Sequence, residues 1–400
     1  MRLLLPLLFL TPSLCAGHSS LPPPGSPERD SLFSDESLSI YTGISTTYRS
    51  DTALPEEGLW QIPGVLMGGD AHGVDQRFAL DDASVHLRWL SEEGVRVLLD
   101  AGSHHGDAVD LEQAAIGYRF SGSWQPEVTM GRLKAAFSEE NRTHSFSRSF
   151  SETNPVYSAF YGGHFVDEGL RLEASPGAGF TIGAETWRGG AFPATPGENG
   201  GAHDIYVRWH GGSQNLSLGA GAWAMAARAS DRADDRNDSG HSHGGVDTET
   251  QDLRFDGDQD SAGLTLQLTR HFASGFDWSL SGEMVAVEVD GIVRDTTRAA
   301  ELTGDYQAFW IRTGLAWQRQ SLSLQYARIT PDNHLAGPAA EALAIKAGLM
   351  AKDSDPDWLG ISYQYKLVDN LGLRLEWTRN RLADERSDYL GLGLYWSRFL

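Results

Sequence analysis

Apolar and polar residues alternate one by one over most of the chain from residue 38 onward. In "LTLQLT", Leu264, Leu266 and Leu268 stand on one side, and the threonines and the glutamine stand on the other. Because successive side chains of a β-strand point to opposite faces, a period of two predicts strands whose two faces meet different surroundings. The pattern therefore predicts an all-β chain.

Sixteen segments carry this alternation, and the links between them follow a regular order. The segments are predicted at 38–48, 84–90, 95–101, 113–120, 126–134, 169–174, 180–188, 204–210, 215–226, 262–272, 276–288, 306–318, 321–328, 358–367, 371–379 and 388–399. Long links (49–83, 102–112, 135–168, 189–203, 227–261, 289–305, 329–357, 380–387) alternate with short ones (91–94, 121–125, 175–179, 211–214, 273–275, 319–320, 368–370). Outer-membrane barrels have short periplasmic turns at one rim and long external loops at the other. We therefore expect a transmembrane antiparallel β-barrel of about 16 strands over residues 37–400.

The start of the chain and its composition fit an exported protein. Residues 1–16, "MRLLLPLLFLTPSLCA", combine one arginine, an apolar run and small residues, which predicts a cleaved signal peptide, and 17–36 form a proline-rich lead-in. The single cysteine, Cys15, leaves with that peptide, so no disulfide is expected. A net charge of −22 argues against nucleic-acid binding, which favours basic surfaces. The expected location is the bacterial cell outer membrane, with lipid around the barrel.

Parity along the strands places a set of charged side chains on the inward face. These are Arg88, Arg96, Arg119, Arg171, Arg208, Arg312, Lys366 and Arg374, with Asp100, Glu173, Glu185, Asp277, Glu283 and Glu376. A mixed, slightly basic wall is typical of a water-filled pore. The alternative is that these charges pair across neighbouring strands and set no selectivity.

A short stretch at the start of the third long link carries a family resemblance. Residues 131–140, "GRLKAAFSEE", have the order Gly-x-x-Lys-x-x-Phe-Ser-x-Glu, and an aromatic loop and a strand opening at Gly169 follow. This stretch resembles the phosphate-selective porin (O/P-like) family of outer-membrane channels. The resemblance implies a sixteen-stranded, trimeric porin whose third long loop, 135–168, folds inward and narrows the lumen. The family's arginine ladder and lysine cluster have no residue-by-residue match here.

On that resemblance, charged residues of the third loop and of the wall are candidates to line a constriction. The loop candidates are Lys134, Glu139, Glu140, Arg142, Arg148 and His164, and the wall candidates are Arg96, Arg119, Arg208, Arg312 and Arg374. Charges at a narrow point between low-dielectric walls act strongly on passing ions. The alternative is that the loop residues only solvate the loop or pair with one another.

The fifth long link, 227–261, is acidic and bears histidines. Residues 231–260 hold ten acidic and three basic side chains, with His241 and His243 among them. His104 and His105 lie similarly near aspartates in the second long link. Imidazole together with carboxylate suits zinc, although a Gly/Ser-rich loop gives no fixed geometry. We therefore expect no cofactor beyond loosely bound Zn²⁺, with a merely solvated loop as the alternative.

These observations favour a channel over an enzyme. The sequence has no Gly-x-Ser-x-Gly elbow, no His-Glu-x-x-His and no phosphate-binding glycine loop. The predicted function is passive diffusion of small hydrophilic solutes or ions through an outer-membrane porin, which the family resemblance makes a homotrimer. The alternative is a zinc-capturing outer-membrane channel or receptor that uses its external loops.

Overall fold

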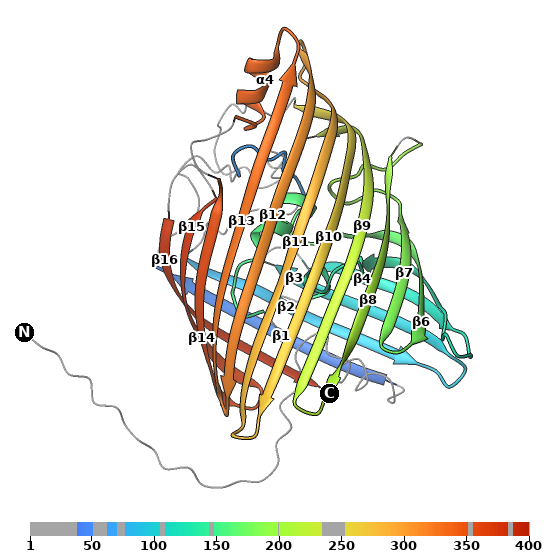
Figure 1. Cartoon of the computed structure of the whole chain (residues 1–400), viewed down its shortest axis with the longest axis vertical. Coiled ribbons are helices and arrows are strands. Elements are labelled where there is room, and N and C mark those ends of the chain that lie inside the picture. Colours follow the sequence, from blue (N-terminus) through green and yellow to red (C-terminus); the bar gives the residue numbers. More distant parts are fainter. Residues whose placement is uncertain are drawn as a thin grey trace, which may run out of the picture.

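The computed structural model describes residues 38–50, 62–69, 77–104, 109–143, 148–198, 200–233, 253–350, 355–382 and 387–399. These residues form a closed barrel of sixteen antiparallel strands in which each strand pairs with its neighbours in sequence and β1 closes against β16 (Figure 1). The predicted barrel is confirmed. The predicted signal peptide and the predicted lead-in lie outside the described residues, as do His105, His241 and His243.

The sixteen predicted strands correspond one to one with the observed ones. The strands are β1 (Leu38–Arg49), β2 (Phe78–Leu90), β3 (Val95–His104), β4 (Asp110–Arg119), β5 (Glu127–Lys134), β6 (Val166–Gly177), β7 (Phe180–Trp187), β8 (Gly201–Ser213), β9 (Leu216–Ala233), β10 (Arg254–Phe272), β11 (Phe276–Arg294), β12 (Ala299–Trp317), β13 (Gln320–Ala336), β14 (Asp357–Val368), β15 (Leu371–Arg381) and β16 (Ser387–Phe399). Short helices α2 (Glu139–Arg142), α3 (Pro155–Tyr161) and α4 (Ala340–Lys346) lie in the links. Within the described part of the chain, no helix has the length and apolar character needed to span a membrane.

An apolar belt runs around the outward face of the barrel. Leu264, Met284 and Phe309 stand side by side on β10, β11 and β12, and all three are exposed. Their sequence neighbours Glu283 and Trp310 point inward and are buried. A band of outward apolar side chains on a closed barrel is the surface that faces lipid.

Strands β10 to β13 continue well beyond this belt, and their polarity reverses there (Figure 1). On β11, Val287 and Val289 point inward and are buried, whereas Glu288 and Asp290 point outward and are exposed. The prediction of a long loop at 289–305 is therefore wrong, because the observed link between β11 and β12 is only 295–298. The prediction ended the strand where apolar residues cease to occupy the outward positions. Above the belt the strand continues, with its apolar residues at the inward positions. The link predicted at 102–112 likewise shortens to 105–109.

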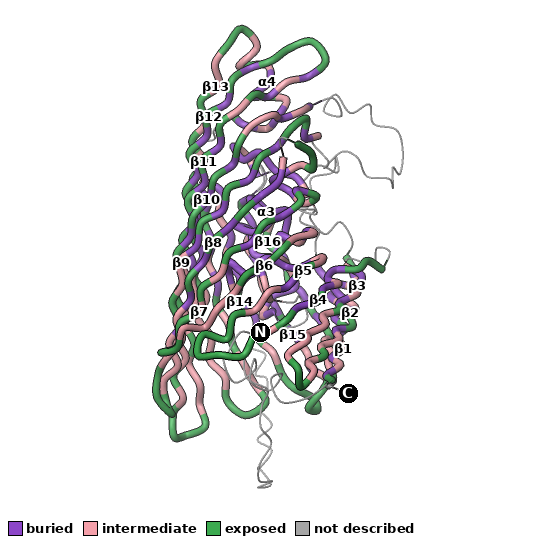
Figure 2. The backbone as a smooth tube through the Cα atoms, turned by 90° about the vertical axis from the view of Figure 1, so that its right-hand side faces the viewer, coloured by how far each residue is buried: buried purple, intermediate pink, exposed green. Residues whose placement is uncertain are grey.

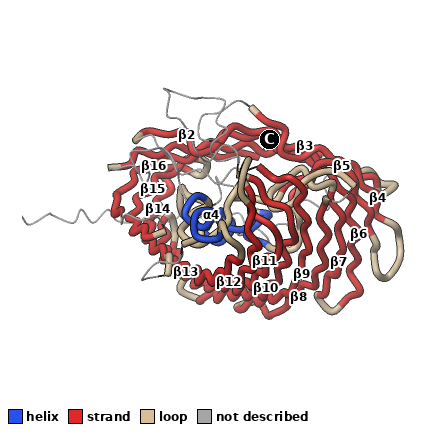
Figure 3. The backbone as a smooth tube through the Cα atoms, turned by 90° about the horizontal axis from the view of Figure 1, so that it is seen from above, coloured by secondary structure: helices blue, strands red, loops and turns tan. Residues whose placement is uncertain are grey.

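The tall part of the barrel encloses an apolar core near the loop rim. Val293, Leu302 and Ile329 of the wall are buried, and Leu343 of α4 and Val65 join them in one hydrophobic cluster. Seen from above, α4 lies inside the ring of strands (Figure 3). Two hydrogen bonds hold residues 62–69 in this core, from the Gly64 N–H to the Gly348 carbonyl (2.8 Å) and from Asn333 Nδ2 to the Gly64 carbonyl (2.6 Å). The described loop residues therefore cover the lumen on the side of β10 to β13.

Candidate pore constriction

The link between β5 and β6, residues 135–165, turns into the barrel and packs on the inner wall (Figure 2). We call it the inward loop; its residues 144–147 are outside the described part. Every residue of α3 within it is buried. Phe160 stacks on Tyr306 of β12 with ring centroids 5.9 Å apart, and Tyr161 Oη lies 3.0 Å from Ser261 Oγ of β10. The loop thus occupies the interior of the barrel, and these two contacts lie just above the apolar belt, at the register of Val287.

A buried asparagine closes the neck of the inward loop. Asn141 Nδ2 donates to the carbonyls of Ala135 (2.9 Å) and Phe165 (3.1 Å), and the Phe165 N–H donates to Asn141 Oδ1 (2.8 Å). One side chain therefore ties the first residue of the loop to the last. The pattern of the sequence gave no indication of this role, because nothing in "NRTHS" shows which backbone groups the asparagine meets.

Glu283 of β11 is the main wall anchor for the loop. Its carboxylate accepts from Tyr157 Oη (2.8 Å) and Ser138 Oγ (3.3 Å) of the loop. The indole N–H groups of Trp223 (2.8 Å) and Trp310 (3.1 Å) donate to the same carboxylate from the wall. Burial, together with the neighbouring Glu283 charge, raises the pKa of Tyr157 well above its usual value, so the phenol remains a donor.

Two further wall carboxylates hold the loop from other directions. Glu185 of β7 accepts from the backbone N–H of Ala136 at 2.8 Å. Glu376 of β15 accepts from the N–H of Ser151 at 3.0 Å and from its hydroxyl. Charged acceptors form stronger hydrogen bonds than neutral ones. Three carboxylates spread around the wall therefore fix the position of the loop.

The acidic loop candidates pair with arginines. Glu139 Oε1 lies 3.1 Å from Arg142 Nη1 and 3.3 Å from Arg208 Nη1, so it joins the loop to β8. Glu140 Oε1 lies 3.0 Å from Arg312 Nη2 on β12. Burial opposes ionisation of Glu139, but Arg142 and Arg208 outweigh it and hold its pKa below the ordinary value. The structure brings these charges together as ion pairs, which is the pairing alternative raised by the sequence.

Arg148 and His164 form a contact deep in the loop. Arg148 donates through Nη2 to His164 Nε2 and through Nη1 to Thr153 Oγ1 (2.9 Å). Burial and the nearby Arg148 charge push the pKa of His164 well below its usual value, so the imidazole is neutral. Its Nδ1 lies 3.1 Å from the Asn141 carbonyl, which places the ring proton on Nδ1. Both side chains stiffen the loop.

The wall arginines are paired as well, but several remain open to solvent. Arg96 and Arg119 share Glu127, at 3.1 and 3.0 Å, near the turn rim. Their side chains are 28% and 33% exposed, against 12% for Glu127. Arg312 is 19% exposed against 6% for its partner Glu140.

The same imbalance occurs at Arg88, which is 26% exposed beside a fully buried Asp100. Arg208 is an exception, because its partner Glu173 is the more exposed of the two. At the pairs of Arg88, Arg96, Arg119 and Arg312, the guanidinium is the more exposed partner and the carboxylate the more buried one. Net-neutral pairs can therefore present a basic surface to a passing ion.

Arg374 differs from the other wall candidates. It faces inward as expected, but it is buried, with Nη2 3.0 Å from Asp81 Oδ2 and 2.9 Å from Thr47 Oγ1. Arg49, also buried, contacts the other oxygen of Asp81 at 3.0 Å. Arg374 is therefore part of a buried ion cluster and is not accessible to solutes.

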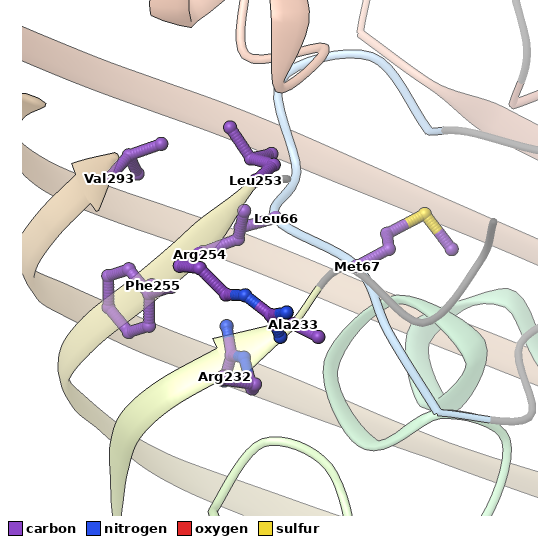
Figure 4. A pocket seen from close by; sticks show the side chains of 8 residues that line it. All are labelled: Leu66, Met67, Arg232, Ala233, Leu253, Arg254, Phe255 and Val293. Atoms are coloured by element: carbon purple, nitrogen blue, oxygen red, sulfur yellow. The ribbon is translucent and has the colours of Figure 1, made fainter. Parts of the chain in front are cut away.

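A small pocket at the loop rim is filled by its own side chains (Figure 4). It lies between the ends of β9 and β10 and residues 62–69, and Leu66, Met67 and Leu253 line it. The guanidinium of Arg232 stands 4.6 Å from the ring centre of Phe192 and 4.7 Å from that of Phe255. Such cation–π contacts stabilise the packing of this rim and leave no room for a solute.

Comparison with known proteins places the fold in a class. No protein-family model matches the sequence, and no curated protein matches it. The outer-membrane channel DcaP of Acinetobacter baumannii superposes with a TM-score of 0.54 at 10% identity, covering 90% of this chain and 96% of that one. The anion-selective porin of Comamonas acidovorans gives 0.52 at 13% identity, with 90% and 99% covered.

The trimer form of OmpT, an outer membrane protein of Vibrio cholerae, gives 0.51 at 10% identity, covering 90% of this chain and 99% of that one. At these identities the likeness concerns the fold. The chain has the fold of outer-membrane β-barrel porins and channels, with an inward loop across its lumen.

Proposed function

We propose that this protein is an outer-membrane porin that lets small hydrophilic solutes and ions diffuse through its lumen, with anions favoured. The supporting observation is the unequal exposure of the paired charges: Arg96 and Arg119 are more exposed than Glu127. A permeating anion meets guanidinium groups before it meets the carboxylates behind them. Charge rings and patches of this kind set ion preference in pores.

The chain's negative net charge does not oppose this preference, because part of the acidity lies outside the barrel. Glu288 stands directly between Asp260 and Asp305 on neighbouring strands, and all three point outward above the belt and are exposed. Bulk salt screens exposed charges over about 10 Å at 0.1 M ionic strength. The partly enclosed lumen charges therefore act more strongly on permeating ions than the outer carboxylates do.

Finer features of the proposal rest on sequence and on relatives. Membership of the phosphate-selective porin family is supported by residues 131–140. Export to the outer membrane is supported by the signal-like residues 1–16, and a homotrimer by the family resemblance and by the trimer form of the OmpT neighbour. We assign no enzymatic activity to the protein.

Reversal potentials in planar bilayers test this proposal. With the protein between unequal KCl solutions, we expect discrete open-channel steps and a reversal potential of the sign given by chloride preference. Replacing Arg96 and Arg119 with glutamine removes two exposed positive charges and should shift the reversal potential toward potassium. Arg328→Gln is the matched control, because Arg328 lies on the exposed outer face and pairs with Asp355.

The two parts of the proposal fail in different ways. Absence of any conductance from the folded barrel would contradict the channel itself. A cation preference in the parent protein, or an equal shift in the Arg328→Gln control, would contradict the role given to the lumen arginines while leaving the channel intact.

A further inference from the structure

Two β-bulges bring extra acidic side chains into the lumen where β2, β3 and β4 approach the loop rim. The pairing of β1 with β2 skips Asp81, so that Asp81 and Asp82 are both buried inside. The pairing of β3 with β4 skips Glu112, and Glu112 and Gln113 are likewise both buried. Bulges re-aim side chains and often occur beside functional sites.

His104 stands between two of these carboxylates. It is the last residue of β3 and the direct cross-strand partner of Asp82. His104 Nδ1 lies 3.3 Å from Asp82 Oδ2, and Nε2 lies 2.8 Å from Glu112 Oε1. One donor atom from each of the three residues falls within 4.8 Å of the others. The imidazole is 42% exposed, so one side of the group is open to solvent.

The remaining oxygen of each carboxylate is already engaged. Ser84 Oγ donates to Asp82 Oδ1 at 2.7 Å. Lys134 Nζ lies 2.8 Å from Glu112 Oε2. These contacts orient the two carboxylates so that Asp82 Oδ2 and Glu112 Oε1 both face His104. Partners that fix the ligating side chains in this way are typical of protein metal sites.

We propose that Asp82, His104 and Glu112 bind one divalent transition-metal ion, such as Zn²⁺ or Mn²⁺, on the lumen wall near the loop rim. One imidazole with two carboxylates suits these ions, whereas Ca²⁺ and Mg²⁺ prefer ligand sets made only of oxygen. The two carboxylates balance the charge of the ion, and Lys134 keeps its contact with the far oxygen of Glu112.

A metal ion binds one nitrogen of an imidazole, whereas Asp82 now meets His104 Nδ1 and Glu112 meets Nε2. The His104 ring or the Asp82 carboxylate must therefore turn for both carboxylates to reach an ion on Nε2. Zinc lies about 2.0–2.2 Å from nitrogen and oxygen ligands, so His104 Nε2 and Glu112 Oε1 must separate by roughly half an ångström. The exposed side of His104 allows that movement. The ion would stand beside Lys134, the last residue before the inward loop, and its binding does not depend on the proposed conduction.

Calorimetry with Zn²⁺ on the refolded full barrel tests the site. His18, His72, His105, His144, His241 and His243 are first replaced by glutamine, so that only histidines in the described part of the chain can contribute. In this parent we expect one saturable Zn²⁺ site per chain and no heat from Ca²⁺. His104→Gln, Asp82→Asn and Glu112→Gln should each weaken Zn²⁺ binding by at least tenfold. His271→Gln is the matched control, because His271 pairs with Asp277 at 2.9 Å.

Visible absorption of bound Co²⁺ gives a second reading, because its ligand-field bands report a nitrogen and oxygen environment. We expect these bands in the parent and in His271→Gln, and their loss in His104→Gln. Absence of saturable Zn²⁺ binding in the parent would overturn the proposal, as would full affinity in His104→Gln. If His104→Gln does not fold, the Asp82→Asn and Glu112→Gln variants serve instead, and full Zn²⁺ affinity in both would overturn the proposal.

Discussion

Replacing Asn141 with alanine tests whether the neck of the inward loop holds the loop in the lumen. The change removes three hydrogen bonds and leaves the buried Phe165 N–H without its acceptor. At about 0.5–1.5 kcal/mol for each bond, the expected loss is about 1.5–4.5 kcal/mol, and the orphaned N–H favours the upper half of that range. The backbone hydrogen bonds between the barrel strands are unaffected. The substitution should therefore lower the free energy of local opening of the loop and leave the barrel closed.

Amide hydrogen exchange of peptides covering residues 160–166 measures that local opening. Because about 1.4 kcal/mol corresponds to a tenfold change in an equilibrium, exchange should quicken roughly tenfold to a thousandfold. Asn380→Ala is the matched control, because Asn380 is also buried but accepts from Leu382 N–H (2.9 Å) outside the loop. Open-channel current should become noisier in Asn141→Ala only. Unchanged exchange at residues 160–166 in the folded variant would refute the assignment of Asn141 as the closure of the neck.

Three further predictions concern charges. Asp81→Asn removes the carboxylate that contacts the buried Arg49 and one of the two that lie near Arg374, the other being Glu376. It should lower the free energy of unfolding by about 3–5 kcal/mol, seen as earlier unfolding in detergent, with the reversal potential unchanged. The folded-state pKa of Glu139 lies below its ordinary value of 4.5, because Arg142 and Arg208 outweigh the effect of burial. Its stabilising contribution is therefore present above pH 4.5 and lost as the pH falls through the folded-state pKa. Current noise should rise over that acid range, and Glu139→Gln should abolish this pH dependence. Glu288→Gln relieves repulsion from the carboxylates opposite it and should stabilise the barrel by about 0.2–1 kcal/mol at low salt, an effect that thermal unfolding in 1 M salt should no longer show.

The turn-side ends of the strands could be predicted from the sequence, and many of the loop-side ends could not. Near the turns the apolar residues lie on the outward face, so alternation places the start of β11 at residue 276, as observed. Beyond Val287 the valines lie on the inward face, with only Ile292 outward among the large apolar residues of β11, and the observed strand continues to Arg294. Apolar and polar residues still alternate with a period of two, but most of the apolar residues now lie on the inward face instead of the outward face.

The face on which a candidate site residue lies could be predicted where side chains alternate regularly along a strand. It could not be predicted where a β-bulge interrupts the alternation. Arg96 and Arg119 point inward as their spacing predicts, and they share Glu127, which is the direct cross-strand partner of Arg119 and lies two strands from Arg96. Asp81 and Glu112 are the extra residues of bulges, and no periodic pattern assigns a face to an extra residue. The burial of Arg374 and the environment of His104 depend on those two residues, so both required the three-dimensional structure.

Because polarity reverses along β10 to β13, the outward face of each of these strands meets lipid over one segment and water over the next. Around Met284 the outward side chains meet lipid, where moving an apolar group from lipid to protein gains little. Around Val287 and Val289 the outward face meets water, and the inward valines are buried by the same hydrophobic effect that stabilises a soluble protein. The rim therefore has its own heat-capacity signature, and it can lose its core by cooling or by dilute denaturant while the lipid-embedded wall below stays closed.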